Sequence, residues 1–234
     1  MPTRAQTCLI SLSAGGAAVN DFTTQMTWSS KAFVDLVWPV IQEPLGGGQI
    51  IPVEAVTKEE MRKHLDRLAG IDAWQICGGR GGMRGIASRV QRIKHGARSY
   101  NTFTIRYAIA SGRDTEWDKR LRAIEQADQG WLSPYWTCQA YISEETQGKP
   151  VCLLACAVVR TRDLIGYAKA GLGHEDRAKV YTQTNRYDGN EFLVVNWHGL
   201  ESAGLLPICA IPQTESPKSP EYVWTGERYE QIPF

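Results

Sequence analysis

The segment from Gly70 to Gln91 constrains the fold of this chain more than any other. It reads GIDAWQICGGRGGMRGIASRVQ, in which two short apolar runs are separated by Gly-Gly-Arg-Gly-Gly. Glycine-rich turns between short runs of β-forming residues are typical of β-hairpins. We therefore predict a hairpin whose strands cover residues 71–77 and 83–91.

Hydrophobic periodicity predicts helices and strands on both sides of this hairpin. Helices are expected over residues 29–45, 57–70, 114–128 and 161–171. Further strands are expected over residues 46–56, 101–109, 134–142, 150–159 and 190–200. Helices interspersed among strands in this order favour an α/β fold with a mixed central β-sheet flanked by helices.

Local signals mark the ends of two of these helices. Ser29 or Ser30 is placed to cap the first helix, and Pro39 predicts a kink or an early end within it. Thr57, with Glu60 three residues later, predicts a capping box for the helix over 57–70.

Composition is that of a globular protein without a membrane span. The chain has 234 residues, of which 43% are hydrophobic and 22% charged. No apolar stretch approaches the roughly 20 residues that cross a bilayer. We predict one domain over residues 1–212 and a C-terminal extension, rich in Pro, Ser and charge, over 213–234. Assembly as a homodimer is left open.

The six cysteines form no CxxC pair, which favours free thiols and a reduced, cytoplasmic compartment. The N-terminus superficially resembles a signal peptide, but its apolar part, Cys8 to Leu12, is short and interrupted by Ser. An edge strand or an ordered arm is the favoured interpretation.

Positive charge is concentrated around the hairpin, although the net charge of the whole chain is only +1. Seven cations and no acidic residue lie between Arg80 and Arg106. A solvated hairpin surface and a site for an anionic partner both explain this cluster. Because Thr104 and Arg106 share one face of their strand, they suit phosphate contacts. The candidate nucleic-acid contacts are Arg84, Arg92, Lys94, Thr104 and Arg106.

The hairpin also has the layout of a metal site. Asp72 lies near the start of the first strand, and Arg89 and Gln91 share one face of the second. Hydrolysis of phosphodiesters by Mg²⁺ needs carboxylates that converge from separate elements, together with a polar or cationic group beside the attacked phosphate. Asp72 as a turn cap or as a partner of Arg89 is the structural alternative.

These motifs resemble the PD-(D/E)XK nuclease-like superfamily, in which a helix with an acid precedes a strand with a metal-binding Asp, a turn, and a strand ending in Glu-x-Lys. GID at 70–72 is similar to the Asp element, and IASRVQ at 86–91 is similar to the last strand. The chain departs from the pattern because Arg89 and Gln91 stand at the places of Glu and Lys.

The resemblance implies a restriction-endonuclease-like core and a DNA endonuclease that depends on Mg²⁺ or Mn²⁺. Asp72 would bind the metal, Gln91 would orient the water, and Arg89 and Arg106 would hold phosphate. The helix acid would be Asp35 or Glu43. Candidates for the missing acid are Glu54, Asp66 and Glu116.

Two other classes of function remain open. One is a nucleic-acid-binding or protein-interaction module that keeps the fold without catalysis. The other is an enzyme of unrelated chemistry, such as a transferase that uses Arg106 and Glu116.

Overall fold

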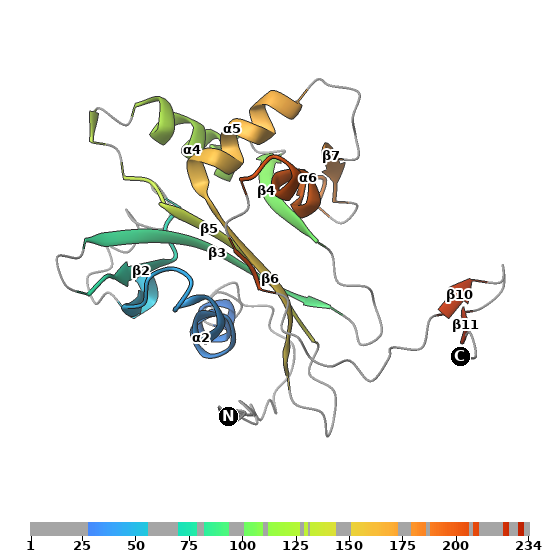
Figure 1. Cartoon of the computed structure of the whole chain (residues 1–234). Coiled ribbons are helices and arrows are strands. Elements are labelled where there is room, and N and C mark those ends of the chain that lie inside the picture. Colours follow the sequence, from blue (N-terminus) through green and yellow to red (C-terminus); the bar gives the residue numbers. More distant parts are fainter. Residues whose placement is uncertain are drawn as a thin grey trace, which may run out of the picture.

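The computed structural model describes most of the chain between residues 28 and 210, and two short strands beyond it (Figure 1). The described residues are 28–55, 70–78, 82–93, 101–109, 112–126, 129–130, 132–143, 151–172, 179–185, 188–205, 208–210, 222–224 and 229–231. The side chains of residues 208–210, 222–224 and 229–231 are outside this description.

A six-stranded mixed sheet forms the centre of the fold. Its strands, in spatial order, are β1 (Gln49–Pro52), β2 (Ala73–Ile76), β3 (Met83–Ile93), β5 (Trp136–Ser143), β6 (Leu153–Arg160) and β9 (Ile208–Ala210). β3 and β5 are parallel, and every other neighbouring pair is antiparallel. All eight residues of β5 are buried, as expected for a strand covered on both faces.

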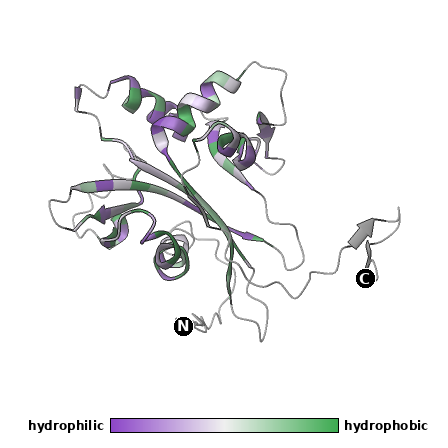
Figure 2. Ribbon diagram, in the orientation of Figure 1, coloured by the Kyte–Doolittle hydropathy of each residue, from purple (hydrophilic) through white to green (hydrophobic). Residues whose placement is uncertain are grey.

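The predicted hairpin is confirmed. β2 and β3 are antiparallel, with Ala73 opposite Ile86 and Ile76 opposite Met83. Polar and apolar residues are mixed along β3, whereas β6 is mainly hydrophobic (Figure 2). Because successive side chains of a strand point to opposite faces, Ile86 and Val90 pack in one core and the intervening Arg89 points to the other face.

A second, three-stranded antiparallel sheet lies beside the first. Its order is β4 (Thr102–Ala108), β8 (Glu191–Asn196) and β7 (Val180–Thr184). The strand expected over 101–109 is thus present, but it pairs with β8 and not with a strand of the large sheet. β4 and β8 share one hydrophobic core with β5 and β6.

Helices cover both faces of the large sheet (Figure 1). On one face, the helical residues from Trp28 onward, which include the π-helical turn η1 (Phe33–Val37) and α2 (Trp38–Ile41), pack on Ile86 and Val90. On the other face lie α4 (Glu116–Glu125), α5 (Thr161–Gly171) and α6 (Trp197–Ser202). The chain therefore has the mixed α/β fold that its pattern predicts.

Pro39 does not itself end the first helix, which continues two residues beyond it but ends four residues before the predicted position 45. The helix continues to Ile41, and the π-helical turn directly before α2 widens the backbone where the proline ring would otherwise meet the preceding turn. Ser29 and Ser30 lie within the helix and not at its N-cap. Ser30 instead donates a hydrogen bond to Oε2 of Glu54 at 2.8 Å.

Two other expected boundaries are shifted. The strand expected over 190–200 ends at Asn196, whose side chain accepts a hydrogen bond from the backbone N–H of His198 and begins α6. The strand expected over 46–56 ends at Pro52 and is followed by the 3₁₀ turn η2 (Val53–Ala55). In both places a helical turn begins before the run of apolar residues ends, and the strand stops there.

Several predictions fall on residues outside those that the structure describes. These are the N-terminal arm, the helix over 57–70 with Thr57, Glu60 and Asp66, and the cation Lys94. Within the predicted extension, β10 (Tyr222–Trp224) and β11 (Tyr229–Gln231) form an antiparallel pair. No helix in the described ranges is long and apolar enough to cross a membrane.

The close contact between Gly85 and Ile71 provides a test of the hairpin. A Cβ atom at Gly85 would lie 2.9 Å from Cδ1 of Ile71, a side chain with no exposed surface. We expect Gly85→Ala to lower the free energy of unfolding by about 1–3 kcal/mol through overpacking. Urea denaturation would measure this change. The control is Gly82→Ala, where the added Cβ has no neighbour within 4 Å; equal denaturation midpoints for the two variants would contradict the packing described.

Candidate functional site

An ion pair between the large sheet and α4 is the centre of the candidate site. Nη2 of Arg89, on β3, lies 2.5 Å from Oε1 of Glu116, in the first turn of α4. The two side chains are 22% and 29% exposed, so the pair is partly shielded from water. This pair brings together two residues that are far apart in the sequence and that sequence analysis had selected separately.

The position of Glu116 follows from the start of its helix. Thr115 is the N-cap: its hydroxyl accepts the backbone N–H of Asp118, while Asp118 accepts the backbone N–H of Thr115. This capping box starts the helix at Glu116 and so holds the carboxylate at the positive end of the helix dipole.

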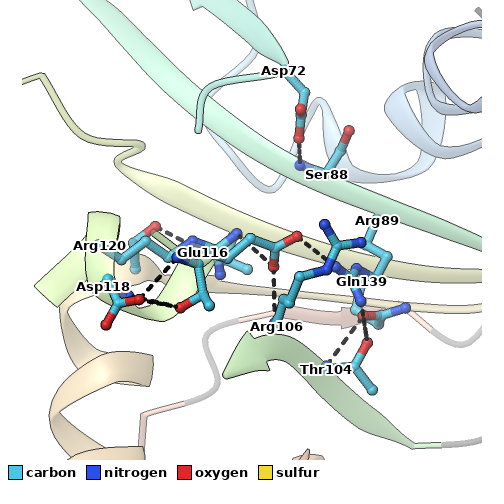
Figure 3. Close-up of polar contacts among 12 residues, drawn as sticks. Asp72, Ser88, Arg89, Thr104, Arg106, Glu116, Asp118, Arg120 and Gln139 are labelled. Carbon is cyan, nitrogen blue, oxygen red and sulfur yellow. Dashed lines mark hydrogen bonds and ion pairs between the residues drawn. The ribbon is translucent and has the colours of Figure 1, made fainter. Parts of the chain in front are cut away.

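Two more arginines approach the same carboxylate (Figure 3). Oε2 of Glu116 lies 3.9 Å from Nη2 of Arg120 and accepts the backbone N–H of Arg106 at 3.3 Å. Burial alone would raise the pKa of Glu116, but the charges of Arg89 and Arg120 and the Arg106 N–H lower it from 4.5 to about 2. Glu116 is therefore ionised at neutral pH.

Arg120 is the most buried cation of this group. Its side chain is 8% exposed, and its Nη1 has no hydrogen-bond partner within the described structure. Burial lowers the pKa of Arg120, while the negative charges of Glu116 and Asp72 raise it. A buried guanidinium nitrogen without a partner is costly, because it has lost the hydrogen bonds that water would supply.

Polar side chains extend the site along β5 and β4. The amide of Gln139, which is 1% exposed, donates to Oε1 of Gln91 at 3.3 Å and accepts from the hydroxyl of Thr104 at 3.2 Å. The same hydroxyl accepts a hydrogen bond from Nη1 of Arg89 at 3.3 Å. Arg89 and Arg106 both contact the ring of Phe192 on β8, at 5.3 and 6.0 Å from its centroid.

Asp72 extends the hairpin ladder beyond the first residue of β2. Its backbone N–H donates to the carbonyl of Ile86, and its Oδ2 accepts the backbone N–H of Ser88 at 2.5 Å. The carboxylate also acts electrostatically on Arg120. Asp72 therefore has a structural role in the hairpin and contributes negative charge to the site.

Of the acids proposed to replace the missing carboxylate, Glu116 reaches Arg89. Glu54 instead accepts the hydroxyl of Ser30, on the helix that covers the opposite face of the sheet. Asp35 and Glu43 have exposed side chains, on that same helix and in the turn after it. The structure therefore assembles Asp72, Arg89, Gln91 and Glu116, and leaves Glu54 and Glu43 outside this group.

The predicted nucleic-acid contacts separate into two groups. Thr104 and Arg106 belong to the site around Glu116. Arg84 stacks on Tyr135, and Arg92 lies 3.6 Å from the ring centroid of Trp28 in the covering helix. Alternation along β3 explains the separation, since even-numbered residues lie on the face opposite Arg89.

A metal ion fits the arrangement less well than an anion does. Among the described residues, no three His, Cys, Asp or Glu side chains gather to hold a metal. Both oxygens of Glu116 already bind arginine or backbone N–H groups. Arg89, Arg106 and Arg120 outnumber the nearby acids Asp72 and Glu116, so a dication would add to an excess of positive charge.

Sequence analysis missed Arg120, Gln139 and Phe192. Arg120 follows Glu116 by four residues, a spacing that places two side chains on one helical face. Gln139 is a polar residue within the apolar run WTCQAYI, and a buried polar residue needs partners. Phe192 carried no comparable signal, because its place beside Arg89 depends on the pairing of β8 with β4.

Comparison with family models, with curated proteins and with solved structures finds no match to this chain.

The stability contribution of Glu116 should depend on pH. Because folding lowers its pKa from 4.5 to about 2, ionised Glu116 stabilises the fold above about pH 4.5, and the contribution is lost as the pH falls towards 2. We expect Glu116→Gln to lower the free energy of unfolding by about 2 kcal/mol at pH 7 and by progressively less below about pH 4.5. Urea denaturation at a series of pH values would measure this difference.

The matched control for this experiment is Glu125→Gln on the same helix. Glu125 pairs with Lys169, and both side chains are more than half exposed, so its removal should change stability little at any pH. Identical pH profiles for the two variants would contradict the electrostatics described for Glu116.

Proposed function

We propose that this chain binds DNA through its phosphodiester backbone, and that Arg89, Arg106 and Arg120 form the phosphate site. The observation that carries the proposal is the group of three arginines around one carboxylate, with the side chain of Arg106 exposed and that of Arg89 partly exposed. A guanidinium group binds phosphate through two parallel hydrogen bonds, and Arg106 and Arg89 can offer such donors to a ligand, while the buried Arg120 adds positive charge behind them.

The charge and exposure of the site support an anionic ligand. Three arginines surround one strongly ionised glutamate, with Asp72 as the second nearby acid. Arg106 has an exposed side chain and Arg89 a partly exposed one, so a ligand can approach from their side. Two oxygens of one phosphate would compete with the carboxylate of Glu116 for these arginine donors. The exchange would leave no buried cation without a negatively charged partner.

The resemblance to the PD-(D/E)XK superfamily supports DNA as the source of the phosphate. The helix before β1, the antiparallel β2 and β3, and the placing of Asp72 and Arg89 on one site follow the order of that family's motifs. A restriction-endonuclease-like core is part of this proposal. In this core, the carboxylate of Glu116 from α4 would replace the acid that the family pattern has on β3, at the position of Arg89.

Metal-dependent cleavage of DNA is the second candidate, and one observation favours it: the charges of Asp72 and Glu116 both act on the guanidinium group of Arg120. Mg²⁺ can be held by two carboxylates together with substrate phosphates. Asp72 and Glu116 would hold it, after Glu116 exchanges its pairing with Arg89. Bound Mg²⁺ or Mn²⁺ supplies activated water and charge neutralisation, while Gln91 orients water and Arg106 holds phosphate.

DNA binding can be tested at Arg106, which is exposed and whose side chain has no ion pair in the described residues. We expect Arg106→Gln to weaken binding to duplex DNA severalfold and to reduce the salt dependence of log K by about 1, as for the loss of one phosphate contact. Fluorescence anisotropy at several salt concentrations measures both. Lys169→Gln, which removes one positive charge from α5, is the control; an unchanged salt dependence in Arg106→Gln would refute the assignment.

Cleavage can be tested with plasmid and branched DNA in the presence of Mg²⁺ or Mn²⁺. If the chain is a nuclease, Asp72→Asn should reduce the cleavage rate by about 100-fold, the scale typical of removing one polar group from a reaction centre, and Glu116→Gln should act similarly. Glu125→Gln should leave the rate unchanged. If the wild type binds DNA but cleaves it with neither Mg²⁺ nor Mn²⁺, the nuclease candidate is rejected and the DNA-binding function is retained.

A further inference from the structure

A second group of arginines surrounds an exposed aromatic ring near the start of β3. The guanidinium carbon of Arg84 lies 5.1 Å from the ring centroid of Tyr135, and that of Arg160 lies 5.8 Å from it. Both distances are within the range of cation–π attraction. We call Arg84, Tyr135 and Arg160 the tyrosine patch.

The ends of three neighbouring strands hold the tyrosine patch in place. The backbone N–H of Tyr135 donates to the carbonyl of Gly85 at 2.7 Å, and its carbonyl accepts the N–H of Thr161 at 3.0 Å. Its ring meets the indole of Trp136 edge to face, with centroids 4.9 Å apart. Tyr135 is therefore fixed between β3 and the junction of β6 with α5 before any ligand binds.

The arginines of the patch retain hydrogen-bonding capacity. Stacking on a ring uses the face of a guanidinium group and leaves the N–H donors at its edge available. In the ranges that the structure covers, neither Arg84 nor Arg160 forms an ion pair, whereas Arg89 and Arg120 both contact Glu116. Within the described residues, the tyrosine patch is thus a positively charged surface to which no acid is paired.

An apolar side chain close to Tyr135 in the sequence is also exposed. Tyr135 is 40% exposed and Leu132, three residues earlier, is 55% exposed. A surface that combines aromatic and aliphatic groups with free guanidinium edges matches a ligand that carries both flat apolar rings and negative charge.

We propose that the tyrosine patch binds a single-stranded segment of nucleic acid, an inference that rests on the proposed function. Phosphates bind the guanidinium edges of Arg84 and Arg160, and an unpaired base packs on the exposed part of Tyr135. A single strand is favoured over a duplex because base faces are accessible only where bases are unstacked.

The patch is distinct from the site around Glu116. Arg84 and Arg89 are five positions apart in β3, a distance of about 17 Å along an extended strand, and their side chains lie on opposite faces. A nucleic acid that contacts both must therefore pass around the sheet. This passage suits a flexible single strand better than a stiff duplex.

Binding of a fluorescein-labelled oligo(dT) to the full chain tests this inference. We expect Tyr135→Ala to weaken binding about tenfold, within the range found for the loss of one stacked base, and Arg84→Gln to weaken it severalfold. Affinity for duplex DNA should change little in both variants. Arg162→Gln, an exposed arginine of α5 that does not contact Tyr135, is the matched control and should bind oligo(dT) nearly as the wild type does.

Photocrosslinking gives an independent result that a loss of folding cannot mimic. Oligo(dT) in which bromodeoxyuridine replaces thymidine should crosslink to the wild-type chain at Tyr135, as identified by mass spectrometry of the digested complex. A crosslink that maps only to other parts of the chain would overturn the inference. Displacement of oligo(dT) from the patch by poly-glutamate at equal charge would do the same, since it would show a general polyanion surface.

The two proposals fail in different ways. If duplex DNA binds and Arg106→Gln weakens that binding, but oligo(dT) affinity is unaffected by Tyr135→Ala and Arg84→Gln, the tyrosine patch has no role and the proposed function stands. If the wild type binds neither duplex DNA nor oligo(dT), both proposals are wrong.

Discussion

The ion pair between Arg89 and Glu116 is the interaction on which the candidate site depends. It joins β3 of the large sheet to the first turn of α4, and through the backbone N–H of Arg106 the same carboxylate also holds β4. One side chain therefore connects three elements. Without its negative charge, the guanidinium groups of Arg89 and Arg120 would repel each other in a partly buried space.

This polar site is compatible with a stable fold because apolar packing surrounds it. Ile105 and Tyr141 are fully or almost fully buried in the core shared by both sheets, and the hydroxyl of Tyr141 donates to the carbonyl of Thr102. Gln139 adds a second polar contact between the sheets through Thr104. The polar groups thus fix how β4 lies against β5, while hydrophobic burial supplies most of the stability.

Local sequence signals were sufficient for elements whose structure depends on near neighbours. The glycine-rich turn predicted the hairpin of β2 and β3, and hydrophobic periodicity over residues 114–128 predicted α4. Local signals were insufficient where the structure of an element depends on residues outside the short segment that was considered. The partner of β4 is β8, and the helix around Pro39 continues because a π-helical turn accommodates the ring. Neither outcome can be predicted from a short segment of the sequence.

The sequence by itself determined the alternation that places Arg89 and Gln91 on one face of β3, because successive side chains of a strand point to opposite sides. It also determined that Glu116 and Arg120 share one face of α4. Only the tertiary structure decided that these two faces meet, that Glu54 turns to Ser30 instead, and that Arg84 stacks on Tyr135. The physical reason is that each of these contacts joins residues from separate elements, whose relative placement is set by packing of the whole core.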